Sequence, residues 1–447
     1  MSKTIIIGAG PAGLASAYHC KIQNKKFEVY EASRKVGGNC ITINEKGFYF
    51  DSGAHRLHDV DKKTTELFKN LLKEDLKKIN IPSQIYFRGK FIDFPLSPLN
   101  LMKAIGFKKF FFEGIKIIIN NTFKSKDQNN FKSFAKSKYG SFLSNELLIN
   151  YSEKLWGLNS EKLSTKISGK RLKGLDIKTL IIEFLFGKKE KTKHLDGSFF
   201  YPKYGIGTLF DELANYIDFK NIFLNNKITK IIHKDFKIDL IEINKNKTIK
   251  ADQIISTIPL DFFIKQMSPK PPDKIKNILN SIIYRNIILV AIFLDKKSVN
   301  KNGSMYFPSK DFHFTRIYEP RNRSSKMSPK NKTSLVVEIP CFSKDDIWKN
   351  NSKAVEQNTI KKIIEIGLIK ERDIIGTKTY KIANAYPVLE NKFEDKIKEI
   401  NSYLSKFTNL KNIGRNALFE YSHIHDQFIN SRKIFFENNN HKKQIKK

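Results

Sequence analysis

Residues 4–18 of this 447-residue chain read TIIIGAGPAGLASAY. The apolar start predicts a buried strand and the small residues at the end predict a helix, so the glycines lie in the turn between them. Gly8 permits a tight turn, Gly10 lets the backbone approach a bound group, and Gly13 lets the helix pack closely on the strand. The first turn of such a helix offers free N–H groups to phosphates. The stretch therefore predicts a dinucleotide site.

An acidic residue supports this interpretation. Residues 26–30 read as a second strand, and Glu31 follows it, eighteen positions beyond Gly13 (31 − 13). A carboxylate at this distance accepts hydrogen bonds from both hydroxyls of an unphosphorylated ribose. The ordered set of strand, glycine turn, helix and acid favours FAD as the cofactor. The other residues that we expect to contact it in this part of the chain are Pro11, Ala12, Ala32, Gly38 and Asn39.

The net charge limits the class of partner. The chain has 81 Lys and Arg against 45 Asp and Glu, a formal charge of +36. Much of this excess suits the solvated faces of a chain rich in Lys, Asn and Ile, but it also suits an anionic small-molecule substrate or an anionic membrane surface. Since no zinc-finger, RNP-type or helix-turn-helix motif accompanies the charge, we expect no nucleic-acid partner.

The cysteines indicate the compartment. Cys20, Cys40 and Cys341 are too few and too scattered for a disulfide framework or a Cys-rich metal site. We therefore infer a reducing, cytoplasmic location and expect no metal. Cys40 follows a glycine pair, so it is either a reactive thiol near the cofactor or, in the interpretation that we favour, a buried structural thiol.

Strands and helices alternate along the chain. Residues 62–76 read as a helix, residues 84–94 as a hairpin that turns at Arg88-Gly89-Lys90, and residues 98–186 as mainly helical. Strands return at residues 222–265, 286–294 and 334–339. Residues 360–368 read as a helix. Residues 99–123 combine apolar and aromatic side chains with lysines. We favour a core helix pair there, and a helix on a membrane surface is the alternative.

These blocks predict two interwoven domains. The fold class is α/β, with a Rossmann-type (GR2-like) FAD-binding domain interleaved with a mixed helical and β-sheet substrate domain. We expect the FAD-binding domain to take residues 1–60, 200–265 and 401–447. A mainly helical cap takes residues 61–199, and a β-sheet substrate domain takes residues 266–400.

Several motifs resemble a known flavoprotein superfamily, that of the amine oxidases, protoporphyrinogen oxidase and UDP-galactopyranose mutase. The segments that carry the resemblance are residues 8–13, Glu31, Gly37-Gly38-Asn39-Cys40, Gly53-Ala54-His55, residues 254–259 and Gly414-Arg415. Among the branches, the chain looks most like UDP-galactopyranose mutase. The segments similar to that branch are residues 151–156 followed by Arg171, residues 314–319, residues 385–388 and residues 425–427.

The chain departs from the mutase pattern in several places. Ala54 stands where the mutase has proline, and Arg56-Leu57-His58 replaces its Ile-Phe-His. Phe314 replaces the tyrosine of a Tyr-Thr-Arg strand, and one extra position precedes Arg171. The resemblance therefore supports the fold and the flavin cofactor more strongly than it supports the identity of the substrate.

The resemblance implies roles for individual residues. The flavin would contact Gly53, His55, Gly414, Arg415, Asp426 and Gln427 in addition to the residues named above. Substrate binding would fall to Tyr151, Trp156 and Arg171, and catalysis to His55, Arg316 and Tyr386. Arginine forks suit diphosphate oxygens, and a tryptophan stacks on a base or a sugar face.

Two classes of function remain open from the sequence. The first is a mutase-like isomerase that acts on a nucleotide sugar through reduced flavin, in surface polysaccharide biosynthesis. The second is an oxidase or dehydrogenase that removes hydride from an amine, a porphyrinogen or a related apolar substrate. The basic charge and the arginine and tyrosine set favour the first. The departures from the mutase pattern and the aromatic helices favour the second.

The glycine turn and Glu31 generate a direct prediction: the purified protein is yellow and its FAD is held without a covalent bond. No cysteine lies near the carboxy-terminal flavin motifs to anchor the cofactor. Acid precipitation should release free FAD into the supernatant, where its absorbance is measured. Flavin that stays in the pellet would contradict the non-covalent bond, and a colourless protein that FAD does not reconstitute would contradict the site itself.

Overall fold

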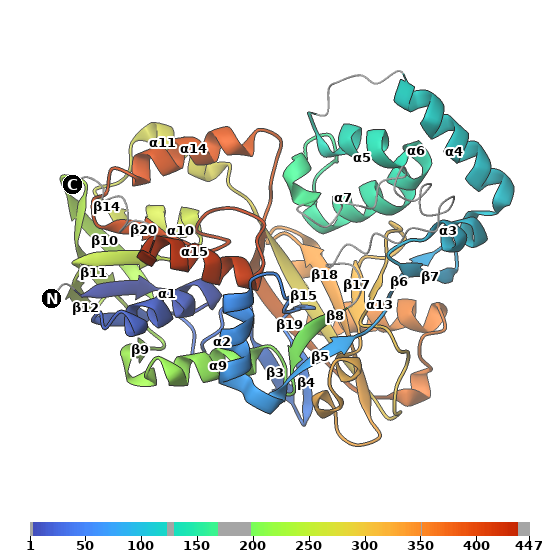
Figure 1. Ribbon diagram of the computed structural model, residues 1–447, viewed down its shortest axis with the longest axis horizontal. Helices are drawn as coiled ribbons and strands as arrows, with labels where there is room; N and C mark the ends of the chain where they lie inside the picture. The colour runs from blue at the N-terminus through green and yellow to red at the C-terminus, as the bar shows by residue number, and fades with distance from the viewer. Residues whose placement is uncertain (1–2, 123–128, 169–197, 350, 437–447) are drawn as a thin grey trace.

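The computed structural model describes residues 3–122, 129–168, 198–349 and 351–436. A five-stranded parallel sheet lies at one end of the molecule, in the order β20-β13-β1-β2-β9 (Figure 1). Its strands come from the beginning, the middle and the end of the chain: β1 (Thr4–Ile7), β2 (Phe27–Tyr30), β9 (Ile222–Phe223), β13 (Gln253–Ser256) and β20 (Leu410–Asn412). The α/β fold predicted from the sequence is confirmed. The division of the chain into domains at residues 60, 199, 265 and 400 stays a prediction.

Helices cover one face of this sheet. The small side chains of α1 allow it to contact both α15 and α9, and α2 packs on α9. Their bounds are α1 (Pro11–Ile22), α2 (Lys62–Leu72), α9 (Gly207–Tyr216) and α15 (Ile424–Phe436). A single hydrophobic core joins them to the sheet, and it includes Ile6, Leu14, Val29, Leu209, Ile255 and Phe428. The first and last segments of the chain are therefore packed into one layer.

A second, four-stranded sheet lies beside the parallel sheet, in the order β12-β11-β10-β14. Its strands are β10 (Ile228–Lys234), β11 (Lys237–Ile243), β12 (Lys247–Lys250) and β14 (Met267–Ser268). The first three lie within residues 222–265, where the sequence predicted strands. Three further helices in this region are α10 (Leu260–Lys265), α11 (Asp273–Asn280) and α14 (Phe393–Leu404).

A seven-stranded sheet forms the opposite half of the molecule, in the order β19-β15-β18-β17-β16-β6-β7. Its strands are β6 (Ser83–Phe87), β7 (Lys90–Phe94), β15 (Tyr284–Leu294), β16 (Ser304–Tyr306), β17 (Arg316–Tyr318), β18 (Thr333–Cys341) and β19 (Ile374–Pro387). Two helices also belong to this half, α12 (Asp346–Lys349) and α13 (Ser352–Glu365). The hairpin expected at residues 84–94 is β6 and β7, and Gly89 with φ +80° forms its turn.

The cap is helical and lies above this sheet in Figure 1. It contains α3 (Pro98–Ile105), α4 (Phe107–Thr122), α5 (Phe131–Tyr139), α6 (Ser141–Leu143), a π-helical turn (Ser144–Ile149) and α7 (Asn150–Trp156). Two small sheets connect the halves: β3 (Thr42–Glu45) with β4 (Phe48–Asp51), and β5 (Leu76–Asn80) with β8 (Ser198–Pro202). In the described part of the chain, no helix is both long enough and apolar enough to cross a bilayer.

Three sequence-based expectations need correction. The helix expected at residues 62–76 ends at Leu72, because Lys73 adopts a positive φ of 47° and the chain turns into β5 at Leu76. The helix expected at residues 360–368 is α13, which begins earlier, after the N-cap residue Asn351, and ends at Glu365.

The third correction concerns residues 99–123, which we expected to form a core helix pair. Leu101 of α3 is buried, but Phe107, Phe111 and Phe112 of α4 are 66%, 58% and 63% exposed. The physical reason is that β7, α5 and Phe142 of α6 cover only one side of the pair. The exposed side has no covering element within the described residues.

An ion pair between the two ends of the chain generates a stability prediction. Asp61 is the N-cap of α2, where it accepts a hydrogen bond from Thr64 N–H, and it also binds Arg432 of α15 at 2.9 and 3.1 Å. We expect Asp61→Ala to cost about 1–2 kcal/mol for the cap and up to about 1 kcal/mol for the partly exposed ion pair. Asp61→Asn keeps the cap, so thermal unfolding of the flavin-bound protein should place it between Asp61→Ala and the wild type.

The same pair fixes a pH dependence. Burial opposes the ionisation of Asp61, but hydrogen bonds from Arg432 and Thr64 lower its pKa to about 2. A depressed carboxylate pKa contributes stability above the unfolded value of about 4, and this contribution is lost as the pH falls toward 2. The difference in melting temperature between wild type and Asp61→Ala should therefore narrow below about pH 4. A difference that widens on acidification would refute this assignment.

Candidate functional site

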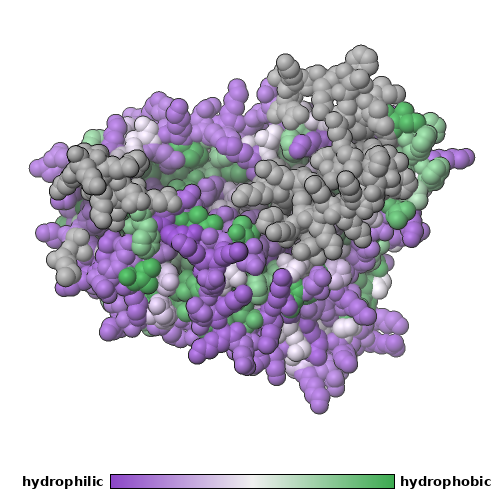
Figure 2. Space-filling model, in the orientation of Figure 1, coloured by the Kyte–Doolittle hydropathy of each residue, from purple (hydrophilic) through white to green (hydrophobic). Residues whose placement is uncertain are grey.

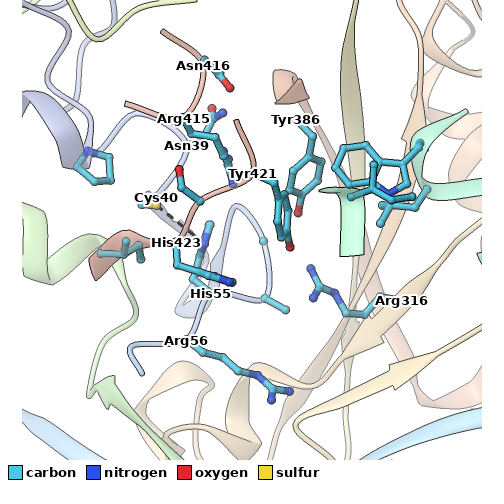
Figure 3. Close-up of a pocket in the computed structure, with 18 of the residues that line it drawn as sticks. Asn39, Cys40, His55, Arg56, Arg316, Tyr386, Arg415, Asn416, Tyr421 and His423 are labelled. Carbon is cyan, nitrogen blue, oxygen red and sulfur yellow. Dashed lines mark hydrogen bonds between the residues drawn. The ribbon is translucent and has the colours of Figure 1, made fainter. Parts of the chain in front are cut away.

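A cavity of about 570 Å³ runs from the glycine turn of β1 to the cap. The carboxyl ends of parallel strands, where ligands bind in open α/β sheets, form its floor. The opposite walls come from α7, from the end of β19 and from the loop before α15. Figure 3 shows Asn39, Cys40 and Arg415 at one side of this space and Arg316 at the other.

Three glycine turns meet at the floor of the cavity. A Cβ added to Gly38 would lie 3.0 Å from the Cα of Gly10, and one added to Gly414 would lie 3.1 Å from the Cβ of Ala12. Gly8 and Gly414 also have positive φ values of 98° and 110°. The backbone therefore stays bare at the N-terminus of α1, and this bare backbone with its helix dipole fits the pyrophosphate of a dinucleotide.

Glu31 lies at the expected edge of this floor. Its two carboxylate oxygens accept backbone hydrogen bonds from Ala9 at 2.7 Å and Ser33 at 2.8 Å, and the residue lines the cavity. These bonds fix the carboxylate at the end of β2, where the ribose of a dinucleotide would reach its remaining lone pairs.

Three residues expected to bind the cofactor do not line the cavity. Gly13 packs against β1, since a Cβ there would lie 1.8 Å from the carbonyl oxygen of Gly8. Ala32 is exposed on the loop after β2. Asp426 accepts a hydrogen bond from His423 N–H at 2.8 Å and so closes the first turn of α15. The other expected cofactor residues all line the cavity: Gly8, Gly10, Pro11, Ala12, Glu31, Gly38, Asn39, Gly53, His55, Gly414, Arg415 and Gln427.

Several buried polar side-chain atoms have no protein hydrogen-bond partner in the described part of the chain. They include three that belong to residues lining the cavity: Nε2 of His55, Oδ1 of Asn416 and Oε1 of Gln427. A buried polar atom without a partner is costly, so such atoms indicate a missing polar ligand. The bare glycine floor, Glu31 and these three atoms together fit the pyrophosphate, ribose and polar ring edge of FAD.

His55 is a neutral imidazole. Burial lowers its pKa to about 3, and Arg415, Arg316 and Arg323 add to this effect through their positive charge. Its Nδ1 lies 3.9 Å from Sγ of Cys40, whose own pKa is raised to about 12 by burial. Cys40 is therefore a buried, protonated thiol, as the favoured sequence interpretation held.

Arg316 is held by a residue that the sequence analysis missed. Its Nε and Nη2 donate hydrogen bonds of 2.6–2.8 Å to the carboxylate of Glu338 on the neighbouring strand β18. Burial lowers the pKa of Arg316, but the Glu338 carboxylate raises it well above its usual value, so the guanidinium stays charged. Glu338 also accepts a hydrogen bond from Ala54 N–H at 3.0 Å. It therefore positions both Arg316 and the loop of His55.

Three aromatic rings form the wall next to Arg316. Trp156 lies 5.9 Å from Tyr386 and 5.8 Å from Tyr421, in edge-to-face contacts measured between ring centroids. The guanidinium of Arg415 lies over the ring of Tyr386 at 5.0 Å. Burial raises the pKa of Tyr386, so its hydroxyl stays protonated. Figure 3 shows Tyr386 and Tyr421 between Arg415 and Arg316.

Two basic side chains, the half-buried Lys154 and the buried Arg285, anchor α7. This helix carries Tyr151 and Trp156 into the cavity. Lys154 donates hydrogen bonds to the carbonyl oxygens of Phe307, Ser309 and Phe312, at 2.5–3.0 Å. Arg285 of β15 donates to the carbonyls of Lys154 and Leu155, both at 3.0 Å, and to that of Pro340. The helix is thus fixed to the loop before β17 and to the large sheet.

The structure brings together Tyr151, Trp156, Arg316, Tyr386 and His55 in one cavity. Arg171 lies outside the described residues. The lining residues that the sequence analysis did not assign include Arg56, Tyr306, Tyr421 and His423. Glu338 had a usable signal, because it is the one charged side chain in the buried strand Thr333–Cys341, and a buried charge requires a partner.

Comparison with known proteins identifies a flavoprotein family. The pattern of the flavin containing amine oxidoreductase family matches residues 11–352. The chain is 22% identical over 360 residues to coproporphyrinogen III oxidase of Bacillus subtilis (strain 168), covering 74% of this chain and 76% of that protein. It is 24% identical over 373 residues to protoporphyrinogen oxidase of Dictyostelium discoideum, covering 67% and 68%.

A solved structure of reduced UDP-galactopyranose mutase has a similar fold. It superposes with a TM-score of 0.86 over 97% of this chain and 93% of the mutase, at 17% identity. At 17% identity, this similarity establishes the fold alone. The class of enzyme follows from the family match. The chain belongs to the flavin containing amine oxidoreductase family and is an FAD-dependent enzyme.

Proposed function

We propose that the enzyme isomerises a nucleotide sugar, in the manner of a UDP-galactopyranose mutase, for surface polysaccharide biosynthesis. The observation that carries the proposal is the charge of the cavity. Arg56, Arg316 and Arg415 line it, and the acidic residue among its described lining residues is Glu31, at the ribose end. A diphosphate suits such a chamber because arginine forks bind phosphate oxygens in pairs.

We assign different side chains of the cavity to different parts of the nucleotide sugar. In the described part of the chain, Nη1 of Arg316 donates to no protein acceptor, whereas Nε and Nη2 are held by Glu338. We assign Nη1 to a phosphate oxygen and the protonated hydroxyl of Tyr386 to the same group. Trp156 and Tyr151 would pack on the base or the sugar. Reduced FAD supplies nucleophilic chemistry at this site when bound.

His55 would orient the substrate without exchanging a proton at neutral pH. Its pKa of about 3 keeps the imidazole neutral, so it offers one donor and one acceptor nitrogen. Its Nε2 is the nitrogen that lacks a partner in the described part of the chain. We therefore assign Nε2 to a hydrogen bond with the flavin or with a sugar hydroxyl.

A second candidate function is oxidation of an apolar anionic substrate. The cap end of the cavity is lined by aliphatic and aromatic side chains that include Phe131, Leu143, Leu147 and Leu148. The curated relatives named above are porphyrinogen oxidases. A porphyrinogen combines an apolar macrocycle with carboxylates, which the same arginines would bind.

Turnover with the flavin in two redox states separates the candidates. Dithionite-reduced enzyme should convert UDP-galactose into its ring-size isomer while oxidised enzyme does not, with no net use of reductant. Product is measured by chromatography of the nucleotide sugars. Coproporphyrinogen serves as the second substrate, and porphyrin fluorescence reports its oxidation. Stoichiometric hydrogen peroxide or consumption of an electron acceptor would place the enzyme in the oxidase class.

The Arg316–Glu338 pair generates a binding prediction. Arg316→Met alone leaves a buried carboxylate without its partner, which costs about 3–5 kcal/mol of stability. The double variant Arg316→Met/Glu338→Gln removes both charges and keeps an acceptor for Ala54 N–H. It should therefore melt close to the wild type and retain FAD.

The double variant should nevertheless bind UDP more weakly by about 1.5–3 kcal/mol, the value of a hydrogen bond to a charged group. Isothermal titration of the flavin-bound proteins measures the difference. Glu338→Gln alone is the matched control, because it keeps the arginine. Equal affinity of the double variant and this control would remove Arg316 from the substrate site.

A further inference from the structure

The outer face of the α3–α4 pair exposes an unusual set of large apolar side chains. The term α3–α4 face is used below for the surface formed by Leu99, Phe107, Phe111, Phe112 and Ile115. Their exposed fractions are 54%, 66%, 58%, 63% and 37%. Single exposed apolar residues are ordinary, but a contiguous group of this size marks an interaction surface. Figure 2 shows apolar surface at the edge of the molecule where Figure 1 places α4.

The geometry of α4 separates this face from the protein core. Phe107, Phe111 and Ile115 follow one another at four-residue intervals, so they form one stripe along the helix. On the other side, Phe110 and Leu101 pack into the cluster of Ile85, Ile92 and Tyr139. The inward side of the pair is therefore satisfied by the fold, whereas the outward stripe has no covering element in the described part of the chain.

Lysines surround the stripe. Lys103 and Lys108 are exposed beside it, and Lys116 is exposed one turn beyond Phe112. Glu113 is the acidic residue of the described part of α4, and Lys116 lies 3.3 Å from it. Aromatic side chains flanked by lysines are the composition of helices that lie in a membrane interface, where rings enter the acyl boundary and ammonium groups meet lipid phosphates.

We propose that the α3–α4 face binds the surface of an anionic membrane, with α4 lying in the plane of the interface. The charge favours lipid over a second copy of this chain, because two chains of formal charge +36 repel one another and two lysine borders would meet across a symmetric contact. Anionic lipid headgroups instead complement the border, and each nearby lysine adds to the attraction.

This surface is coupled to the cavity by packing. The cluster that supports α3 and α4 includes Ile85, Tyr139, Leu143 and Leu147, and these four residues also line the apolar end of the cavity. Membrane contact would therefore place the cap end of the cavity next to the bilayer. The inference rests on the exposed face alone and holds for either candidate function.

Cosedimentation of the flavin-bound protein with lipid vesicles tests the proposal. The wild type should bind vesicles of phosphatidylcholine mixed with phosphatidylglycerol, and should bind phosphatidylcholine alone more weakly. The double variant Phe111→Ser/Phe112→Ser should lose about tenfold or more in vesicle affinity, because each ring contributes buried apolar area. Lys103→Gln and Lys108→Gln should each lose about fivefold, from about 1 kcal/mol per lysine near an anionic surface.

The matched control is Phe219→Ser, which removes a similarly exposed ring (45%) from a short 3₁₀ helix, Phe219–Asn221, elsewhere in the molecule. Flavin content and melting temperature confirm folding, and the lysine variants test the surface if the phenylalanine variant unfolds. A wild-type protein that does not bind anionic vesicles would overturn the proposal. A loss of vesicle affinity in Phe219→Ser equal to that in Phe111→Ser/Phe112→Ser would also overturn it. A dimer in solution that Phe111→Ser/Phe112→Ser converts to a monomer would assign the face to a second copy.

Discussion

The close contact of three glycine turns is the constraint on which the rest of the site depends. Gly13 leaves no room for a Cβ against Gly8, Gly38 approaches Gly10, and Gly414 approaches Ala12. These turns belong to the beginning and the end of the chain, and the parallel sheet brings them together through β1 and β20 on either side of β13. A side chain at any of these contacts would separate the segments that carry the flavin residues.

The arginines around the cavity determine both its charge and part of the pKa shift of His55. Burial lowers the pKa of His55, and the positive charges of Arg415, Arg316 and Arg323 lower it further. The same positive potential favours an anionic substrate. Glu338 of β18 neutralises Arg316 from outside the cavity. Among the described residues, no acidic side chain lines the substrate side. The arginines thus favour an anionic substrate and add to the effect of burial that keeps His55 neutral.

Local signals in the sequence predicted the parts of the site that depend on local backbone. The strand, glycine turn and helix at residues 4–22, Glu31 and the β6–β7 hairpin are of this kind. The pairing of Arg316 with Glu338 was not predicted, because it depends on the register of two strands 22 residues apart in sequence. The exposure of Phe111 was not predicted either, since an amphipathic pattern does not reveal which face the neighbouring elements cover.

The central claim is that an anionic substrate binds in the arginine-lined cavity directly beside the flavin. The most direct measurement is the absorption spectrum of the bound flavin during titration with UDP-galactose, at low and at high salt. A saturable change in the flavin bands that requires more ligand at high salt is the expected result, because binding close to the ring alters its surroundings and the attraction is ionic. A spectrum that stays unchanged at every ligand concentration, with the flavin still bound, would contradict the claim.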